Sequence, residues 1–138
     1  EFGVTPLVRE IPDRIPFLEV QQILRTAQGS MVIGSTEPHY TASKLFQCLV
    51  TSQRTFAFFH EHSEGRKILN LIEATQFFVG YSNDKSREIL VSEVASRLEA
   101  FLDPAMPWSP KTEKLEPHTS RANASKFLAA VEEVISSN

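Results

Sequence analysis

The chain has 138 residues, of which 41% are hydrophobic and 22% charged, a composition that suits one globular domain with one core. Its formal net charge of -3 excludes a global positive field that would collect nucleic acid or anionic membrane. The single Cys48 excludes an internal disulfide and a zinc site built from cysteines. No apolar run approaches the roughly 20 residues that span a bilayer, and the start is unlike a signal peptide, so we expect a cytoplasmic domain without a transmembrane segment.

Hydrophobic patterns divide the first part of the chain into two strands and two helices. The partly alternating run at residues 5–11 predicts a strand, and the proline that closes it favours a sheet edge. Helical spacing at residues 17–27, followed by a glycine, predicts a helix. The uncharged run at residues 31–34 predicts a strand covered on both sides, and a helix should then begin near Thr41 or Ser43.

The second part of the chain continues the alternation of strands and helices. Residues 55–59 and 77–81 are apolar runs that predict strands, and Ser63 should cap the helix between them. A longer helix is predicted at residues 84–102, with an apolar stripe on one side. The last helix should open at Ser120 and turn its apolar side chains inward. These side chains are Ala124, Phe127, Leu128, Val131 and Ile135.

The alternation of apolar strands with helices defines the expected fold class. It predicts an α/β fold, a Rossmann-like parallel sheet of about four strands with helices on both faces. A proline-rich linker and a C-terminal helix should follow the sheet. In such a sheet, ligands bind beyond the carboxyl ends of the strands, where helices begin.

The loop at residues 34–44 has the densest set of polar groups at such a position. A phosphate there could be held by the hydroxyls of Thr41 and Ser43, their backbone N–H groups and the Lys44 ammonium. The alternative is that Thr41 or Ser43 only caps the helix while Lys44 is solvated.

Two other motifs predict different chemistry. Tyr40 and Lys44 have the Tyr-x-x-x-Lys spacing of short-chain dehydrogenases, but no glycine-rich dinucleotide turn occurs among only five glycines. His60 and His62, with His39, could hold zinc, but they lack the helical H-E-x-x-H spacing. We therefore predict no metal site.

A larger pattern resembles a known family. The chain carries REIP at residues 9–12 and FL at residues 17–18, followed by GSMVIGS at residues 29–35, TASKLFQ at residues 41–47 and TFAFFHEHS at residues 55–63. This order resembles the C-terminal, donor-binding half of a two-Rossmann-domain glycosyltransferase of the GT-B type, group 1. The resemblance covers roughly residues 5–102.

The resemblance implies a set of ligand contacts. Gln47 stands where the family has an acidic residue that binds the ribose, and Glu37 is the acidic candidate near the sugar. The base would rest near Arg14, Ile15 and Pro16. The diphosphate of a nucleotide sugar would lie at Thr41, Ala42, Ser43 and Lys44.

The resemblance also implies how the chain is organised. Residues 1–103 would form a partial nucleotide-sugar-binding domain, residues 104–119 a proline-rich linker and residues 120–138 a C-terminal helix. The family's N-terminal domain, which holds the acceptor and usually the catalytic base, would be a partner that this sequence lacks. The chain would then be a fragment of a glycosyltransferase that is inactive alone. Its catalytic residues and its acceptor are unknown. We expect no cofactor, since the nucleotide sugar is the substrate.

A second function class remains open from the sequence. The same pattern of elements fits a small flavodoxin-like regulatory or protein-interaction domain without a nucleotide site.

Overall fold

The computed structural model describes residues 3, 5–35, 37, 39 and 43–136. These residues form an α/β fold around a three-stranded sheet, with strands β1 (Gly29–Ile33), β2 (Arg54–His60) and β3 (Phe78–Tyr81). The strands run parallel in the order β1-β2-β3, with Met31 beside Phe56 and Ala57 beside Phe78. The parallel sheet confirms the expected class.

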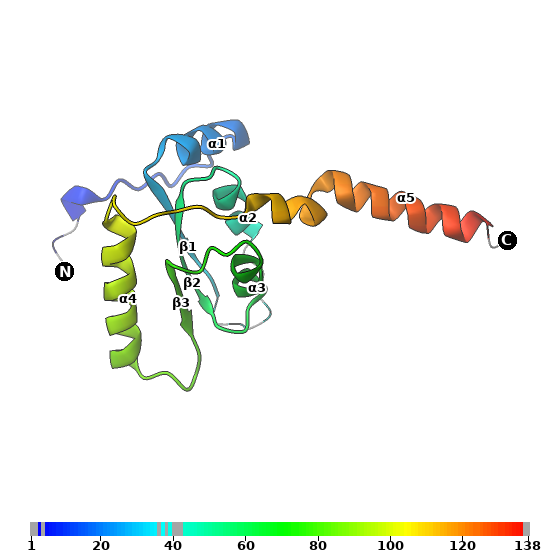
Figure 1. Ribbon diagram of the computed structural model, residues 1–138. Coiled ribbons are helices and arrows are strands. Elements are labelled where there is room, and N and C mark those ends of the chain that lie inside the picture. Colours follow the sequence, from blue (N-terminus) through cyan, green and yellow to red (C-terminus); the bar gives the residue numbers. More distant parts are fainter. Residues whose placement is uncertain (1–2, 4, 36, 38, 40–42, 137–138) are drawn as a thin grey trace.

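Helices cover both faces of the sheet (Figure 1). The crossovers α2 (Ser43–Leu49) and α3 (Glu64–Leu71) pack on one face, and α4 (Arg87–Leu102) packs on the other. The β1-α2-β2 and β2-α3-β3 connections advance across the sheet in the same direction and with the same hand. Their helices therefore lie on the same face. The structure thus confirms helices on both faces.

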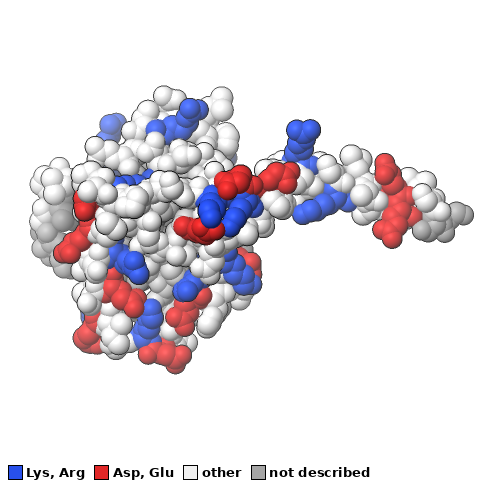
Figure 2. All heavy atoms as spheres, in the orientation of Figure 1, with Lys and Arg blue, Asp and Glu red and all other residues white. Residues whose placement is uncertain are grey.

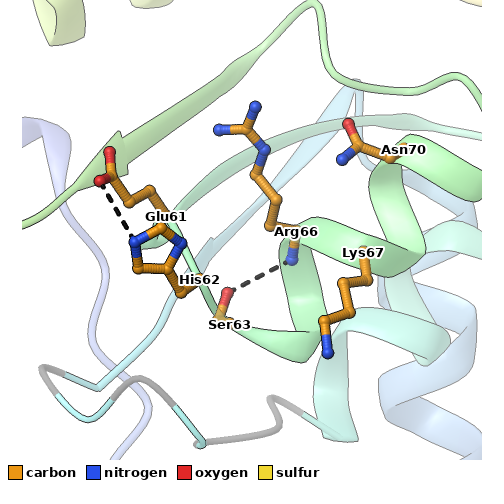
Figure 3. Close-up of a pocket in the computed structure, with 6 residues that line it drawn as sticks. All are labelled: Glu61, His62, Ser63, Arg66, Lys67 and Asn70. Carbon is orange, nitrogen blue, oxygen red and sulfur yellow. Dashed lines mark hydrogen bonds and ion pairs between the residues drawn. The ribbon is translucent and has the colours of Figure 1, made fainter.

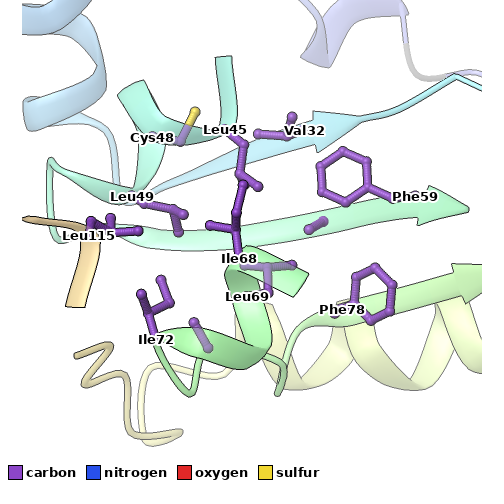
Figure 4. Close-up of a cluster of buried hydrophobic side chains, with 12 residues drawn as sticks. Val32, Leu45, Cys48, Leu49, Phe59, Ile68, Leu69, Ile72, Phe78 and Leu115 are labelled. Atoms are coloured by element: carbon purple, nitrogen blue, oxygen red, sulfur yellow. The ribbon is translucent and has the colours of Figure 1, made fainter. Parts of the chain in front are cut away.

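The larger core lies between β2 and the helices α2 and α3 (Figure 4). Phe59, Leu45 and Leu69 are at most 2% exposed there. Gly34 follows β1 directly, and a Cβ at this position would collide with the Phe59 ring. Close packing at this point therefore requires glycine, and it sets where the polar loop leaves the sheet.

The smaller core lies under α4. Phe56, Phe77 and Val79 are buried there against the predicted stripe of α4, which is Leu90, Val94, Leu98 and Phe101. The helix begins at Arg87, three residues after the predicted start, because the Ser86 side chain accepts a hydrogen bond from the Ile89 N–H and caps it. The predicted Ser63 cap of α3 is confirmed in the same way by its bond from the Arg66 N–H.

The sheet differs from the prediction at its first strands. Residues 5–11 form no strand: Thr5–Leu7 is a 3-10 helix, η1, and Val8 and Ile11 are exposed, so the sheet has three strands and not four. β1 is also covered along its length on one face only. Ser30 and Val32 are buried, whereas Met31 is 55% exposed and Ile33 70% exposed. α4 packs mainly on β2 and β3 and meets β1 at Gly29, against which the Phe101 ring lies, so Met31 and Ile33 further along this face stay exposed.

The segments outside the sheet are α1 (Phe17–Thr26), the 3-10 helix η2 (Thr112–His118) and α5 (Ser120–Ser136). α1 confirms the first predicted helix. The proline-rich segment packs on the core through Trp108 and through Leu115, which is 5% exposed.

The final helix departs from the expected packing. α5 begins at Ser120 as predicted, but it has no buried residue and extends away from the sheet (Figure 1). Phe127 and Ile135 are about 70% exposed, so the prediction of an inward stripe is wrong. None of the described helices is both long and apolar enough to cross a membrane.

Candidate functional site

One cavity of about 570 Å³ brings together two groups of residues that lie far apart in the sequence. Its volume is within the range of small-molecule sites. The first group precedes and opens α1, and the second lies on the first turns of α2. The lining residues are Arg14, Ile15, Pro16, Phe17, Val20, Lys44 and Gln47. The cavity thus joins the predicted base-binding residues to two of those predicted for the diphosphate and ribose.

Local structure explains the α1 wall of this cavity. Pro16 is the residue before the helix, with φ of -57°, and its carbonyl accepts the hydrogen bond of the Val20 N–H at 3.1 Å. Its ring fixes an extended entry into the helix. Arg14 and Ile15 therefore lead toward the cavity rather than continuing the helix.

The α2 wall is oriented by core packing. Leu45, Cys48 and Leu49 are buried against the sheet, so the other side of the helix faces outward. Lys44 and Gln47 lie on that side, three residues apart and hence one turn from each other. The amphipathic pattern of α2 thus places a cation and an amide next to each other in the cavity.

The cavity carries positive charge. Its two charged lining residues are Arg14 and Lys44, and no carboxylate joins them among the described residues that line it. Neither cation makes an ion pair within the described part of the chain. Over the visible face of the molecule, by contrast, acidic and basic side chains are interspersed (Figure 2). The two cations can therefore offer their charge to an anionic group.

The remaining predicted contacts are not gathered in this cavity. Thr41 and Ala42 lie outside the described residues. Ser43 is exposed as the first residue of α2 and is not among the lining residues. Glu37 is also absent from the lining, and its carboxylate lies 3.5 Å from the His39 imidazole, with both side chains exposed.

Sequence reasoning missed Phe17 and Val20, which also line the cavity. Both belong to the helical spacing of apolar residues that predicts the first helix, and that pattern assigns them no ligand. The available signal was their position directly after the predicted base turn. Phe17 is in fact 63% exposed, so the core does not account for it.

A second cavity, of about 470 Å³, opens where β2 ends and α3 begins (Figure 3). Its lining mixes charges of both signs, because Glu61 stands with Arg66 and Lys67, and Lys67 pairs with Glu64. Arg66 and Lys67 extend in different directions in Figure 3. The side chains thus do not converge on one point as a compact anion site requires.

Tyr81 ties the polar loop to the sheet. Its hydroxyl donates a hydrogen bond to the Ser35 carbonyl, and its ring packs against Phe58 with centroids 4.7 Å apart. Burial raises the pKa of Tyr81 above its ordinary value, so the hydroxyl stays protonated and able to donate. Ser35 is therefore anchored at the point where the loop leaves β1.

The histidine pair after β2 is held by local contacts. His60 is buried, and its Nδ1 accepts a hydrogen bond from the His62 N–H at 3.2 Å. In the part of the chain that the structure describes, no group of three or more His, Cys, Asp or Glu side chains is placed to hold a metal ion.

Comparisons with known proteins add no relative. The chain matches no protein-family model, no curated protein and no solved structure.

Proposed function

We propose that this chain is the Rossmann-like donor-binding domain of a nucleotide-sugar glycosyltransferase. One observation carries the proposal: Arg14, Ile15 and Pro16 share a cavity with Lys44 and Gln47. The resemblance assigns the first three to the base and the last two to the diphosphate and ribose. These residues lie about 30 positions apart in sequence, and a common nucleotide site requires them to lie together, as they do in this cavity.

The chemistry of the cavity supports this class of ligand. A nucleoside diphosphate has a flat apolar base at one end and an anionic diphosphate at the other. The cavity offers the apolar Ile15, Pro16 and Val20 together with the cationic Arg14 and Lys44. A charge-assisted hydrogen bond is worth about 1.5–3 kcal/mol, so Lys44, which the resemblance assigns to the diphosphate, should contribute measurably to its binding.

In this proposal the chain binds the donor but does not transfer sugar alone. Transfer requires an acceptor and a catalytic base, which the proposal assigns to a second domain across the cleft. The missing N-terminal domain is thus the proposed partner, and the nucleotide sugar is the substrate.

The experiment is a titration of the 138-residue chain with UDP and GDP, followed by amide NMR and calorimetry. We expect shifts of the amides around Arg14 and Lys44, and a loss of about tenfold or more in affinity for Lys44→Ala. Lys126→Ala is the matched control, because Lys126 lies on α5 and away from the cavity. An absence of shifts at millimolar ligand would remove the nucleotide-sugar proposal.

A protein-interaction role is the second candidate, and the exposed helix α5 favours it. Phe127 and Leu128 are at least 60% exposed on the same helix. Exposed apolar side chains that gather on one element mark interaction surfaces more often than isolated ones do. A chain that fails to bind nucleotides but associates through α5 would support this candidate.

A further inference from the structure

The apolar half of the cavity contains one aromatic side chain. Phe17 is the first residue of α1, and its side chain is 63% exposed while it lines the cavity. Leu18 follows it and is 79% exposed, but it is not among the lining residues. α1 has no buried residue, so core packing does not hold Phe17 in its position. A large aromatic side chain thus lies open to a ligand beside two cations.

We propose that Phe17 is the surface on which the base of a bound nucleoside diphosphate stacks, and that the site accepts both purine and pyrimidine bases. The inference rests on the proposed function and extends it from the diphosphate to the base. Stacking on an aromatic ring tolerates any base, because every base has a π face. Purines present the larger ring surface, so they bind more tightly than pyrimidines.

The other lining residues support weak selectivity among bases. A site that selects one base needs hydrogen-bond donors and acceptors that match the edge of that base. Ile15, Pro16 and Val20, which share the apolar half with Phe17, have none in their side chains. Among the polar lining side chains, Lys44 suits phosphate oxygens and Gln47 a ribose hydroxyl, which leaves Arg14 as the one polar side chain beside the base, and a single side chain does not match a whole base edge.

A different account predicts a different result. Single exposed apolar side chains are common on protein surfaces and need no ligand. If Phe17 is one of these, its removal has no effect on any ligand.

The test measures the affinity of the full chain for ADP, GDP, UDP and inorganic pyrophosphate by NMR titration. Phe17→Ala should weaken all three nucleotides by roughly fivefold or more and leave pyrophosphate unchanged. Phe17→Leu should weaken them similarly, because it keeps an apolar side chain but removes the ring. Leu18→Ala is the matched control and should change nothing. Thermal unfolding of each variant checks that the fold is intact, as expected for an exposed position.

Each other outcome has a definite meaning. If Lys44→Ala weakens nucleotides while Phe17→Ala does not, the base binds elsewhere: the inference is wrong and the proposed function survives. If one base is preferred more than tenfold over the others, the site reads the base edge, and the claim of broad acceptance is wrong. If neither nucleotides nor pyrophosphate bind at millimolar concentration, the proposed function fails and the inference fails with it.

Discussion

Arg54 connects the start of β2 to the end of α4 through its guanidinium group. Nη1 donates to the Phe101 carbonyl at 2.9 Å and to that of Asp103, and Nη2 donates to the Pro104 carbonyl at 3.0 Å and to that of Met106. The group also faces the Phe77 ring, 5.8 Å from its centroid. Its planar fork of donors satisfies backbone carbonyls where the chain turns away from the helix.

Replacing the guanidinium of Arg54 with an ammonium group should destabilise the fold. We expect Arg54→Lys to lower the free energy of unfolding by about 1–2 kcal/mol, because an ammonium cannot reach four carbonyls in this arrangement. Urea denaturation followed by circular dichroism measures the change. Arg87→Lys, at an exposed position on α4, is the control and should stay within about 0.5 kcal/mol of the original chain. Equal stability of Arg54→Lys would show that these hydrogen bonds are replaceable by water.

Neither the carbonyl contacts of Arg54 nor the exposure of Phe17 could be predicted from the sequence. Arg54 looks like a solvated charge at the edge of an apolar run, since its four acceptors lie about 50 residues away. Phe17 looks like a core residue, because periodicity indicates which side of a helix is apolar but not whether anything covers it. The outward direction of Lys44 and Gln47 could be predicted, because the buried residues of α2 occupy the other side of the helix.

At the scale of elements, Glu73 joins the end of α3 to the proline-rich segment. Its carboxylate lies 2.6 Å from the Lys111 ammonium and 2.8 Å from that of Lys114. The hydrogen bonds from Lys111 and then Lys114 lower the pKa of Glu73 from 4.5 to about 2. Because the folded-state pKa of Glu73 is lowered, its contacts with the two lysines stabilise the fold above pH 4.5. This contribution is lost as the pH falls toward 2.

Glu73→Gln should therefore change the pH dependence of stability. The variant is expected to be less stable than the original chain at pH 6, and the difference should shrink between pH 4.5 and 2 and vanish below it. Urea denaturation at pH 6, 4, 3 and 2 measures this. Side chains that are half exposed are screened, so 1 M salt should reduce the difference at pH 6. Glu132→Gln on α5 is the control and should show no such pH dependence. If the two variants show the same pH profile of stability, the prediction is wrong.

The strands show how far local patterns reach. β2 has Phe56 and Phe59 buried on opposite faces, so its uninterrupted apolar run correctly predicts a buried strand. β1 has the same kind of run, yet Met31 and Ile33 are exposed, because α4 reaches this face only at Gly29 through Phe101. Residues 5–11 have strand-like alternation, but an edge strand also requires a neighbour to pair with, and pairing is not encoded in a short window. A strand could therefore be predicted where the strand that pairs with it lies nearby in the sequence.

At the scale of the whole molecule, the chain buries its core without using α5. The last buried core residue is Leu115 in η2, and the contacts of α5 are made mainly with η2. The apolar stripe predicted on α5 exists, but it faces away from the sheet core instead of into it. Periodicity alone cannot distinguish these cases, because it reports an apolar side of the helix and not its partner.

This arrangement predicts that stability and the presence of α5 are separable. A chain that ends at Thr119 should unfold with a free energy within about 0.5 kcal/mol of that of the full chain, because no α5 residue is buried. Leu115→Ala, by contrast, removes a side chain that is 5% exposed and should cost about 2–5 kcal/mol. Urea denaturation of both, with the same spectroscopic probe, makes the comparison. A truncated chain that loses more than about 1 kcal/mol would show that α5 packs on the body of the molecule in solution, whereas an unchanged stability leaves its apolar side chains available for contacts outside this chain.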